Sequence, residues 1–108
     1  MIITNGKHGA VEYLGEFFDL YTISWGKLKL IFSKQEFIEF IDFMDKSRTV
    51  SDLKSYIPDK STYKVGWFVS YSSGGVDLYG NGFSYRFDSE FEYRDFCQMA
   101  LNALKHIA

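Results

Sequence analysis

The sequence predicts an α+β fold made of two similar halves, each an antiparallel strand meander followed by one helix. Three observations support this fold class. The block Asp19-Leu20-Tyr21 precedes a turn, an apolar strand and a helix start, and the same order follows Asp77-Leu78-Tyr79. The chain is rich in strand-favouring aromatic residues, with 11 Phe, 8 Tyr and 2 Trp. Apolar residues at helical spacing follow each apolar strand pair. An internal repeat of this kind indicates architecture rather than chemistry.

The first half contains four predicted strands. The turn cluster at residues 5–9 separates residues 2–4 from residues 10–14, which is typical of a short hairpin. Residues 17–23 and 28–32 are two further apolar runs of strand length. Together they predict a meander whose strands follow one another in sequence.

The second hairpin of this meander is predicted to turn at Ser24-Trp25-Gly26, with Gly26 in the left-handed conformation. A three-residue loop there places Leu20 opposite Leu30 on the core side. It turns Tyr21 and Lys29 to the opposite, outer face of the sheet.

The first helix is predicted to start at a capping box formed by Ser33 and Glu36 and to end near Lys46. Its apolar stripe consists of Phe37, Phe40, Ile41 and Met44, with Ile38 at the edge. Polar residues dominate the following stretch, residues 47–62, which we interpret as the connection between the halves.

The second half begins with a predicted strand at residues 63–71, where apolar and polar residues alternate. Asn81-Gly82 is a strong signal for a two-residue hairpin loop. That loop places Leu78 opposite Tyr85 and Val76 opposite Phe87 on the core side. It also pairs Asp77 with Arg86 on the outer face, a favourable charge pair.

The last helix is predicted to be capped by Asp88 or Ser89, with Glu90 and Glu92 in its first turn. A broad apolar stripe then runs along it: Tyr93, Phe96, Cys97, Ala100, Leu101, Leu104 and Ile107.

These elements predict a single domain, residues 1–108, because neither half can bury its own apolar face. The half-repeats span approximately residues 10–46 and 63–107, joined by the polar connection 47–62. We expect a pseudo-symmetric arrangement with the helices on one side of the sheet. The element order resembles the tandem meander-and-helix units of Whirly- and PUR-type nucleic-acid-binding proteins, a resemblance of plan that transfers no residue or function.

Bulk properties restrict the classes of partner. The formal net charge is −2 and the pI is about 5.6, and the 12 Lys and Arg residues are scattered, which disfavours polyanion binding. No stretch has the ~20 apolar residues that a membrane span requires, and the chain does not start with a signal-peptide pattern. We therefore expect a soluble protein of the cytoplasm with no membrane partner.

The sequence contains no recognisable catalytic or metal-binding set, so we expect neither an enzyme nor a cofactor. His8 lies between turn glycines and His106 near the chain end, and neither has a ligand at metal-binding spacing. Cys97, the single cysteine, lies on an apolar stripe and is interpreted as a buried hydrophobe. The acidic residues of both helices are interpreted mainly as solvent-facing, with an acidic docking face as the alternative: Glu36, Glu39, Asp42, Asp45, Asp88, Glu90, Glu92 and Asp95.

Three aromatic residues fall outside the predicted core and are candidate anchors for a protein partner: Trp25, Phe43 and Phe91. Phe43 and Phe91 are either covered by a loop or exposed as anchors. The first functional hypothesis is therefore a small non-enzymatic protein that binds a protein partner, of the immunity-protein or phage-inhibitor type.

The alternative hypothesis is single-stranded nucleic-acid binding on the outer sheet face, where bases would stack on aromatic rings. The candidate residues for that face are Tyr21, Lys29, Tyr79 and Arg86. The carboxylates of Asp19 and Asp77 beside them oppose phosphate, and charge disfavours this reading. Exposed strand edges also make a homodimer conceivable.

Overall fold

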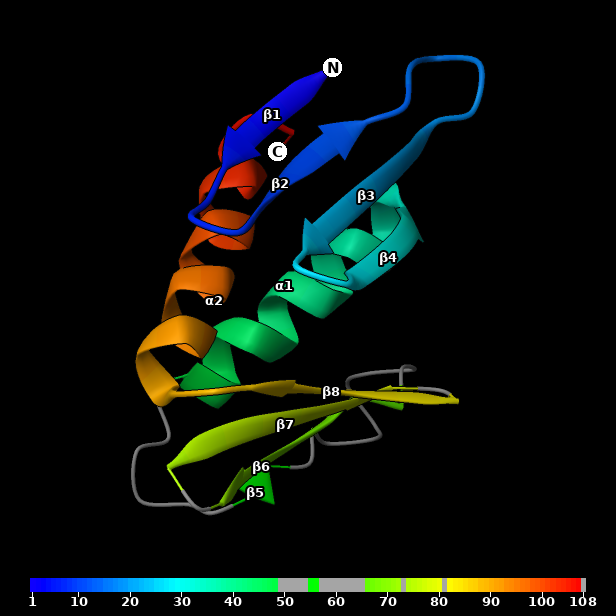
Figure 1. Cartoon of the computed structure of the whole chain (residues 1–108). Helices are drawn as coiled ribbons and strands as arrows, with labels where there is room; N and C mark the ends of the chain where they lie inside the picture. Colours follow the sequence, from blue (N-terminus) through cyan, green and yellow to red (C-terminus); the bar gives the residue numbers. More distant parts are fainter. Residues whose placement is uncertain (49–54, 57–65, 73, 81, 108) are drawn as a thin grey trace.

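The computed structural model describes residues 1–48, 55–56, 66–72, 74–80 and 82–107. Two antiparallel sheets and two helices make up this part of the chain, which confirms the α+β class (Figure 1). In both halves a meander precedes one helix, whereas the pseudo-symmetry of the halves stays a prediction. Most of the connection 47–62 and the strand start at 63–65 lie outside the described residues.

The first sheet has four strands in sequence order: β1 (Ile2–Asn5), β2 (Gly9–Tyr13), β3 (Leu20–Trp25) and β4 (Leu28–Ser33). β1 and β2 form the predicted opening hairpin. β3 begins at Leu20 and not at the predicted Phe17, because residues 14–19 form a loop between β2 and β3.

The predicted register of β3 and β4 is wrong. Leu20 pairs with Ser33, three residues beyond the predicted Leu30, and Tyr21 pairs with Phe32. Trp25 stays in the strand opposite Leu28, so the turn contains only Gly26, at φ +55°, and Lys27. A register shift by an odd number of residues turns every side chain of β3 to the opposite face of the sheet. The observed register buries the large indole of Trp25 on the core side, and this burial outweighs the local preference for a three-residue turn.

α1 (Lys34–Arg48) starts at the predicted capping box. The Glu36 backbone N–H donates to Ser33 Oγ at 3.3 Å, and Glu36 Oε1 accepts from the Ser33 N–H at 2.9 Å. The hydrogen bond from the Ser33 backbone N–H, and to a lesser extent the interaction with the Ser33 hydroxyl, lower the pKa of the Glu36 carboxyl group. All four residues of the predicted stripe are buried, and Phe43 is buried with them.

The second sheet consists of β5 (Ser55–Tyr56), β6 (Phe68–Ser72), β7 (Gly75–Gly80) and β8 (Phe83–Phe87), again in sequence order. The register predicted for the last hairpin is confirmed, with Leu78 opposite Tyr85 and Asp77 opposite Arg86. Gly82 has the positive φ, +84°, that this tight turn requires.

Ser89 caps the start of α2 (Glu90–Leu104), and its Oγ accepts the Glu92 N–H at 3.1 Å. It packs beside α1 and also contacts strands of both sheets: β1, β2, β7 and β8. Both helices therefore lie on the core face of the first sheet. The second sheet lies at the end of the helix pair where α2 begins (Figure 1).

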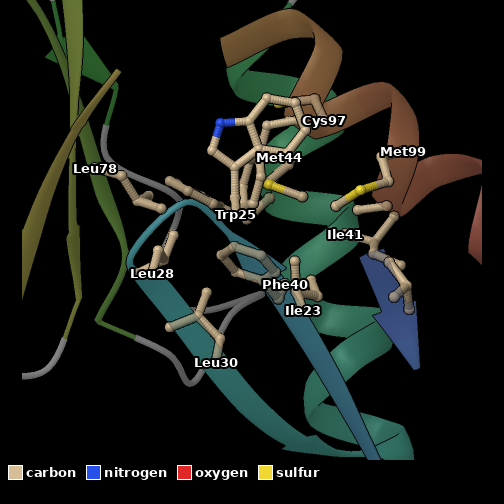
Figure 2. Close-up of a cluster of buried hydrophobic side chains, with 14 of the residues drawn as sticks. Ile23, Trp25, Leu28, Leu30, Phe40, Ile41, Met44, Leu78, Cys97 and Met99 are labelled. Carbon is tan, nitrogen blue, oxygen red and sulfur yellow. The ribbon is translucent and has the colours of Figure 1, made fainter. Parts of the chain in front are cut away.

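The core lies between the first sheet and the two helices, and it continues onto the second sheet. Figure 2 shows Trp25 and Ile23 of β3 beside Met44 of α1 and Cys97 of α2, with Leu78 of β7 reaching the same cluster. Cys97 is fully buried, as predicted. One continuous apolar interior contains buried residues of β2, β3, β4, α1, β6, β7, β8 and α2, and Ile3 of β1 packs against it.

The corrected register predicts that Tyr21→Ala is strongly destabilising. The ring of Tyr21 stacks on Phe37 with centroids 5.3 Å apart and interplanar angle 4°, and it is almost fully buried. We expect its removal to lower the free energy of unfolding by about 3 kcal/mol, measured by urea denaturation. Lys29→Ala, on the exposed face of β4, should change it by less than about 0.5 kcal/mol. Similar small effects from both variants would contradict the register.

Candidate functional site

Phe17, the most exposed aromatic residue of the described ranges, and its exposed neighbour Phe18 lie in the β2–β3 loop. In this loop, residues 14–19, Phe17 is 91% exposed and Phe18 is 61% exposed. Leu14, at its base, is also exposed. The loop extends beyond the first sheet at the upper right of Figure 1. Adjacent exposed aromatic side chains of this size are typical of an interaction surface. We call residues 14–19 the phenylalanine loop.

The phenylalanine loop is shaped by hydrogen bonds of its own backbone. The Leu14 N–H donates to the Leu20 carbonyl at 2.9 Å, and the Asp19 N–H donates to the Gly15 carbonyl at 2.8 Å. The rings of Phe17 and Phe18 contact each other edge to face, with centroids 5.0 Å apart. The loop thus presents both rings on a backbone of defined shape.

Asp19 is the only non-glycine residue with a positive φ, +51°, in the described part of the chain. Asp tolerates this conformation better than most residues but still at a cost in energy. The Tyr13 hydroxyl donates to Asp19 Oδ1 at 3.0 Å and holds the side chain in place. Partial desolvation, this hydrogen bond and the charge of Asp19 raise the pKa of Tyr13.

The charged side chains of the loop and of the two strands that flank it are all acidic. Between Gly9 and Gly26 the chain carries the carboxylates of Glu12, Glu16 and Asp19 and no Lys or Arg. A surface that combines exposed aromatic rings with negative charge favours a partner with an apolar pocket and basic neighbours.

An open groove of about 580 Å³ lies at the same end of the first sheet. Its lining residues are Met1, Ile2, Ile3, Tyr13, Tyr21, His106 and Ile107. Tyr13 belongs both to this groove and to the base of the phenylalanine loop. The exposed rings therefore lie beside further accessible apolar surface.

Two of the three predicted anchor residues are not exposed. Trp25 is 1% exposed because its ring packs on Phe96 and its Nε1 donates to Glu92 Oε1 at 3.0 Å. Phe43 is fully buried, with the ring of Trp67 centred 6.5 Å away. The expectation that Trp25 is accessible is therefore wrong, and of the two alternatives for Phe43 the structure shows the covered one. Phe91, on the first turn of α2, is 75% exposed and stays a candidate.

The residues predicted to form one nucleic-acid-binding face are not brought together. Tyr21 is buried in the core, a correction that follows from the shifted register. Lys29 is exposed on the first sheet, whereas Tyr79 and Arg86 lie on the outer face of the second sheet. Arg86 Nη1 is 2.9 Å from Asp77 Oδ2, so a carboxylate already offsets its charge.

Sequence reasoning missed Phe17 and Phe18 because they lie in an apolar run and were assigned to a strand. Two signals in the sequence mark the loop. Gly15 interrupts the run, and Asp19 follows the two phenylalanines; both residues are common in turns. Both have a positive φ in the structure.

A buried hydroxyl cluster links α1, α2 and β6. Ser47 Oγ shares a 2.6 Å hydrogen bond with the Tyr93 hydroxyl, and the Tyr71 hydroxyl donates to the Ser47 carbonyl at 2.9 Å. Burial raises the pKa of Tyr93 well above its ordinary value and that of Tyr71 to about 12. Because Ser47 and Tyr93 are fully buried, this cluster stabilises the fold and offers no access to a substrate.

The described residues contain no group of three or more metal-ligating side chains. Within the same ranges, no helix is long and apolar enough to cross a membrane. His8 and His106 are both exposed, and His8 contacts the edge of Trp25. No protein-family model, curated protein or solved structure matches this chain.

The buried tyrosines predict a loss of stability at alkaline pH. The folded protein keeps their protons at a pH where the unfolded chain, with a tyrosine pKa near 10.0, releases them. Below pH 10 these tyrosines should therefore contribute no pH dependence to the free energy of unfolding. Between pH 10 and about 12 that free energy should fall as the pH rises. Urea denaturation across this range measures the slope.

Tyr93→Phe should make that slope shallower, whatever it does to stability at neutral pH. Equal slopes for wild type and Tyr93→Phe would contradict the role of this hydroxyl.

Proposed function

We propose that this chain is a non-enzymatic protein that binds a protein partner and that the phenylalanine loop is its principal anchor. The observation that carries the proposal is the pair of exposed rings, Phe17 and Phe18, on a loop held by its own hydrogen bonds. The type of protein that fits this description best is an inhibitor or immunity protein, which acts by occupying a surface of its target.

The energetic reason is the apolar surface that the loop keeps in water. Burying a Phe side chain contributes about 1.5–3 kcal/mol, so two such rings can supply a large share of a binding free energy. A loop already held in shape loses little conformational entropy when it binds. Exposed aromatic anchors on a preformed loop are therefore well suited to a protein interface.

The acidic residues of the loop indicate the charge of the partner. Glu16 lies directly beside Phe17, and Asp19 directly follows Phe18. These carboxylates disfavour phosphate and an anionic membrane surface, and they favour a protein with Lys or Arg around an apolar pocket. Nucleic-acid binding has less support because the residues proposed for it lie on different surfaces, with Tyr21 in the core.

The test is affinity capture from native lysate of the source cells with immobilised wild type and with Phe17→Ala/Phe18→Ala. We expect wild type to retain at least one protein that the double variant does not. Because both rings are exposed, the substitutions should leave the circular dichroism spectrum and the urea midpoint nearly unchanged.

Phe91→Ala is the matched control, since it removes a third exposed ring far along the chain. It should retain the partner as wild type does. Equal recovery by wild type and the loop variant would contradict the proposal. Loss of the partner only with Phe91→Ala would assign the interface to the start of α2 instead.

A further inference from the structure

A second, independent groove lies between the two helices. It has a volume of about 340 Å³ and is lined by residues of both: Gln35, Ile38, Glu39, Ile41, Asp42, Asp45, Leu101 and Leu104. Residues 35–45 of α1 line the groove together with the last turns of α2, because the two helices pack side by side. None of these residues belongs to the phenylalanine loop.

The apolar side chains of the groove come from both helices. Ile41 is buried, whereas Ile38, Leu101 and Leu104 are only partly buried. Burial of α1 and α2 against the first sheet therefore leaves aliphatic surface accessible between them. An aliphatic side chain of a ligand would remove this surface from water.

The charged residues that line the groove are all acidic. Glu39, Asp42 and Asp45 line it, and no lining residue is basic. Gln35 donates to Glu39 Oε1 at 3.2 Å, and Lys46 Nζ is 3.3 Å from Asp42 Oδ2. The Lys46 and Asp42 side chains are both about half exposed, so solvent screens their attraction and a ligand cation can replace it.

We propose that this groove binds a basic peptide segment of another protein. An aliphatic side chain of that segment lies between the helices, and flanking Lys or Arg side chains pair with the carboxylates of Glu39 and Asp42. This is the helix-groove mode of peptide recognition, with charge complementarity setting the choice of ligand. The groove volume suits a short anchor of one or two side chains.

The site goes beyond the proposed function because it gives the chain a second docking surface with its own ligand chemistry. The phenylalanine loop presents apolar side chains to a pocket on its partner. The groove instead accepts an apolar side chain from its ligand. Each surface can therefore be removed without touching the other.

The test is an NMR titration of the full chain with a designed amphipathic helical peptide of leucine and lysine. A peptide with glutamate in place of lysine is the charge control. We expect the lysine peptide to shift the amide resonances of Ile38, Glu39, Asp42, Leu101 and Leu104, and the glutamate peptide to leave them unchanged. Added salt should weaken the binding.

Two variants with the same change in charge distinguish binding in the groove from attraction to the negative charge of the whole protein. Glu39→Lys should weaken binding of the lysine peptide about tenfold. Asp95→Lys makes the same charge change at an exposed position of α2 outside the groove lining and should have a much smaller effect. Ile38→Ala should also weaken binding, because it removes part of the apolar lining.

Three outcomes would overturn the proposal. They are the absence of shifts at the groove, equal weakening by Glu39→Lys and Asp95→Lys, and loss of peptide binding in Phe17→Ala/Phe18→Ala. The last result would assign the peptide site to the phenylalanine loop. If the loop variant binds the peptide normally but still captures its partner from lysate, the proposed function fails while the groove stands.

Discussion

The fold depends on α2, which has to cover the first sheet as well as part of the second. The first sheet contacts this helix through side chains of β1 and β3. Trp25 packs on Phe96 and donates to Glu92, while the Thr4 hydroxyl donates to the Met99 carbonyl at 3.0 Å. Without α2, the core face of β1 and β2 would be left in water. The first meander therefore depends on a helix that comes last in the chain.

Most aromatic residues of the chain pack in the core between the sheets and helices. Their large number is therefore explained by packing. Rings from both halves contact one another in series, with Phe32, Phe40 and Trp67 as one example. The excess is thus largely a property of the core and is not itself a sign of binding. The informative aromatic residues are the few left outside it, above all Phe17 and Phe18.

How well the sequence predicted each element depended on whether local or distant interactions decide it. Asn81-Gly82 specifies its own turn, and the register of β7 and β8 followed from it. Ser33 and Glu36 likewise cap α1 through local contacts. The turn after Trp25 is decided by burial of the indole against a helix 67 residues away, which no local pattern contains. The register error and the misplacement of Tyr21 follow from that one contact.

The candidate sites were predicted less well than the fold for the same reason. Whether Trp25, Phe43 or Phe91 is exposed depends on which part of the other half covers it, and only Phe91 is left accessible. The groove between the helices depends on their pairing, although its acidic residues were identified from the sequence as an alternative docking face. Local periodicity shows which face of a helix is apolar. It does not show how much of that face a neighbour leaves open.

The most direct test of this account is whether the two sheets unfold together. Amide resonances of β2 and β7 can be followed by NMR through one urea titration. If α2 supports both sheets, resonances of the two strands should disappear with the same midpoint and the same steepness. A first sheet that stays folded after β7 has melted, or the reverse, would contradict the dependence of both sheets on α2.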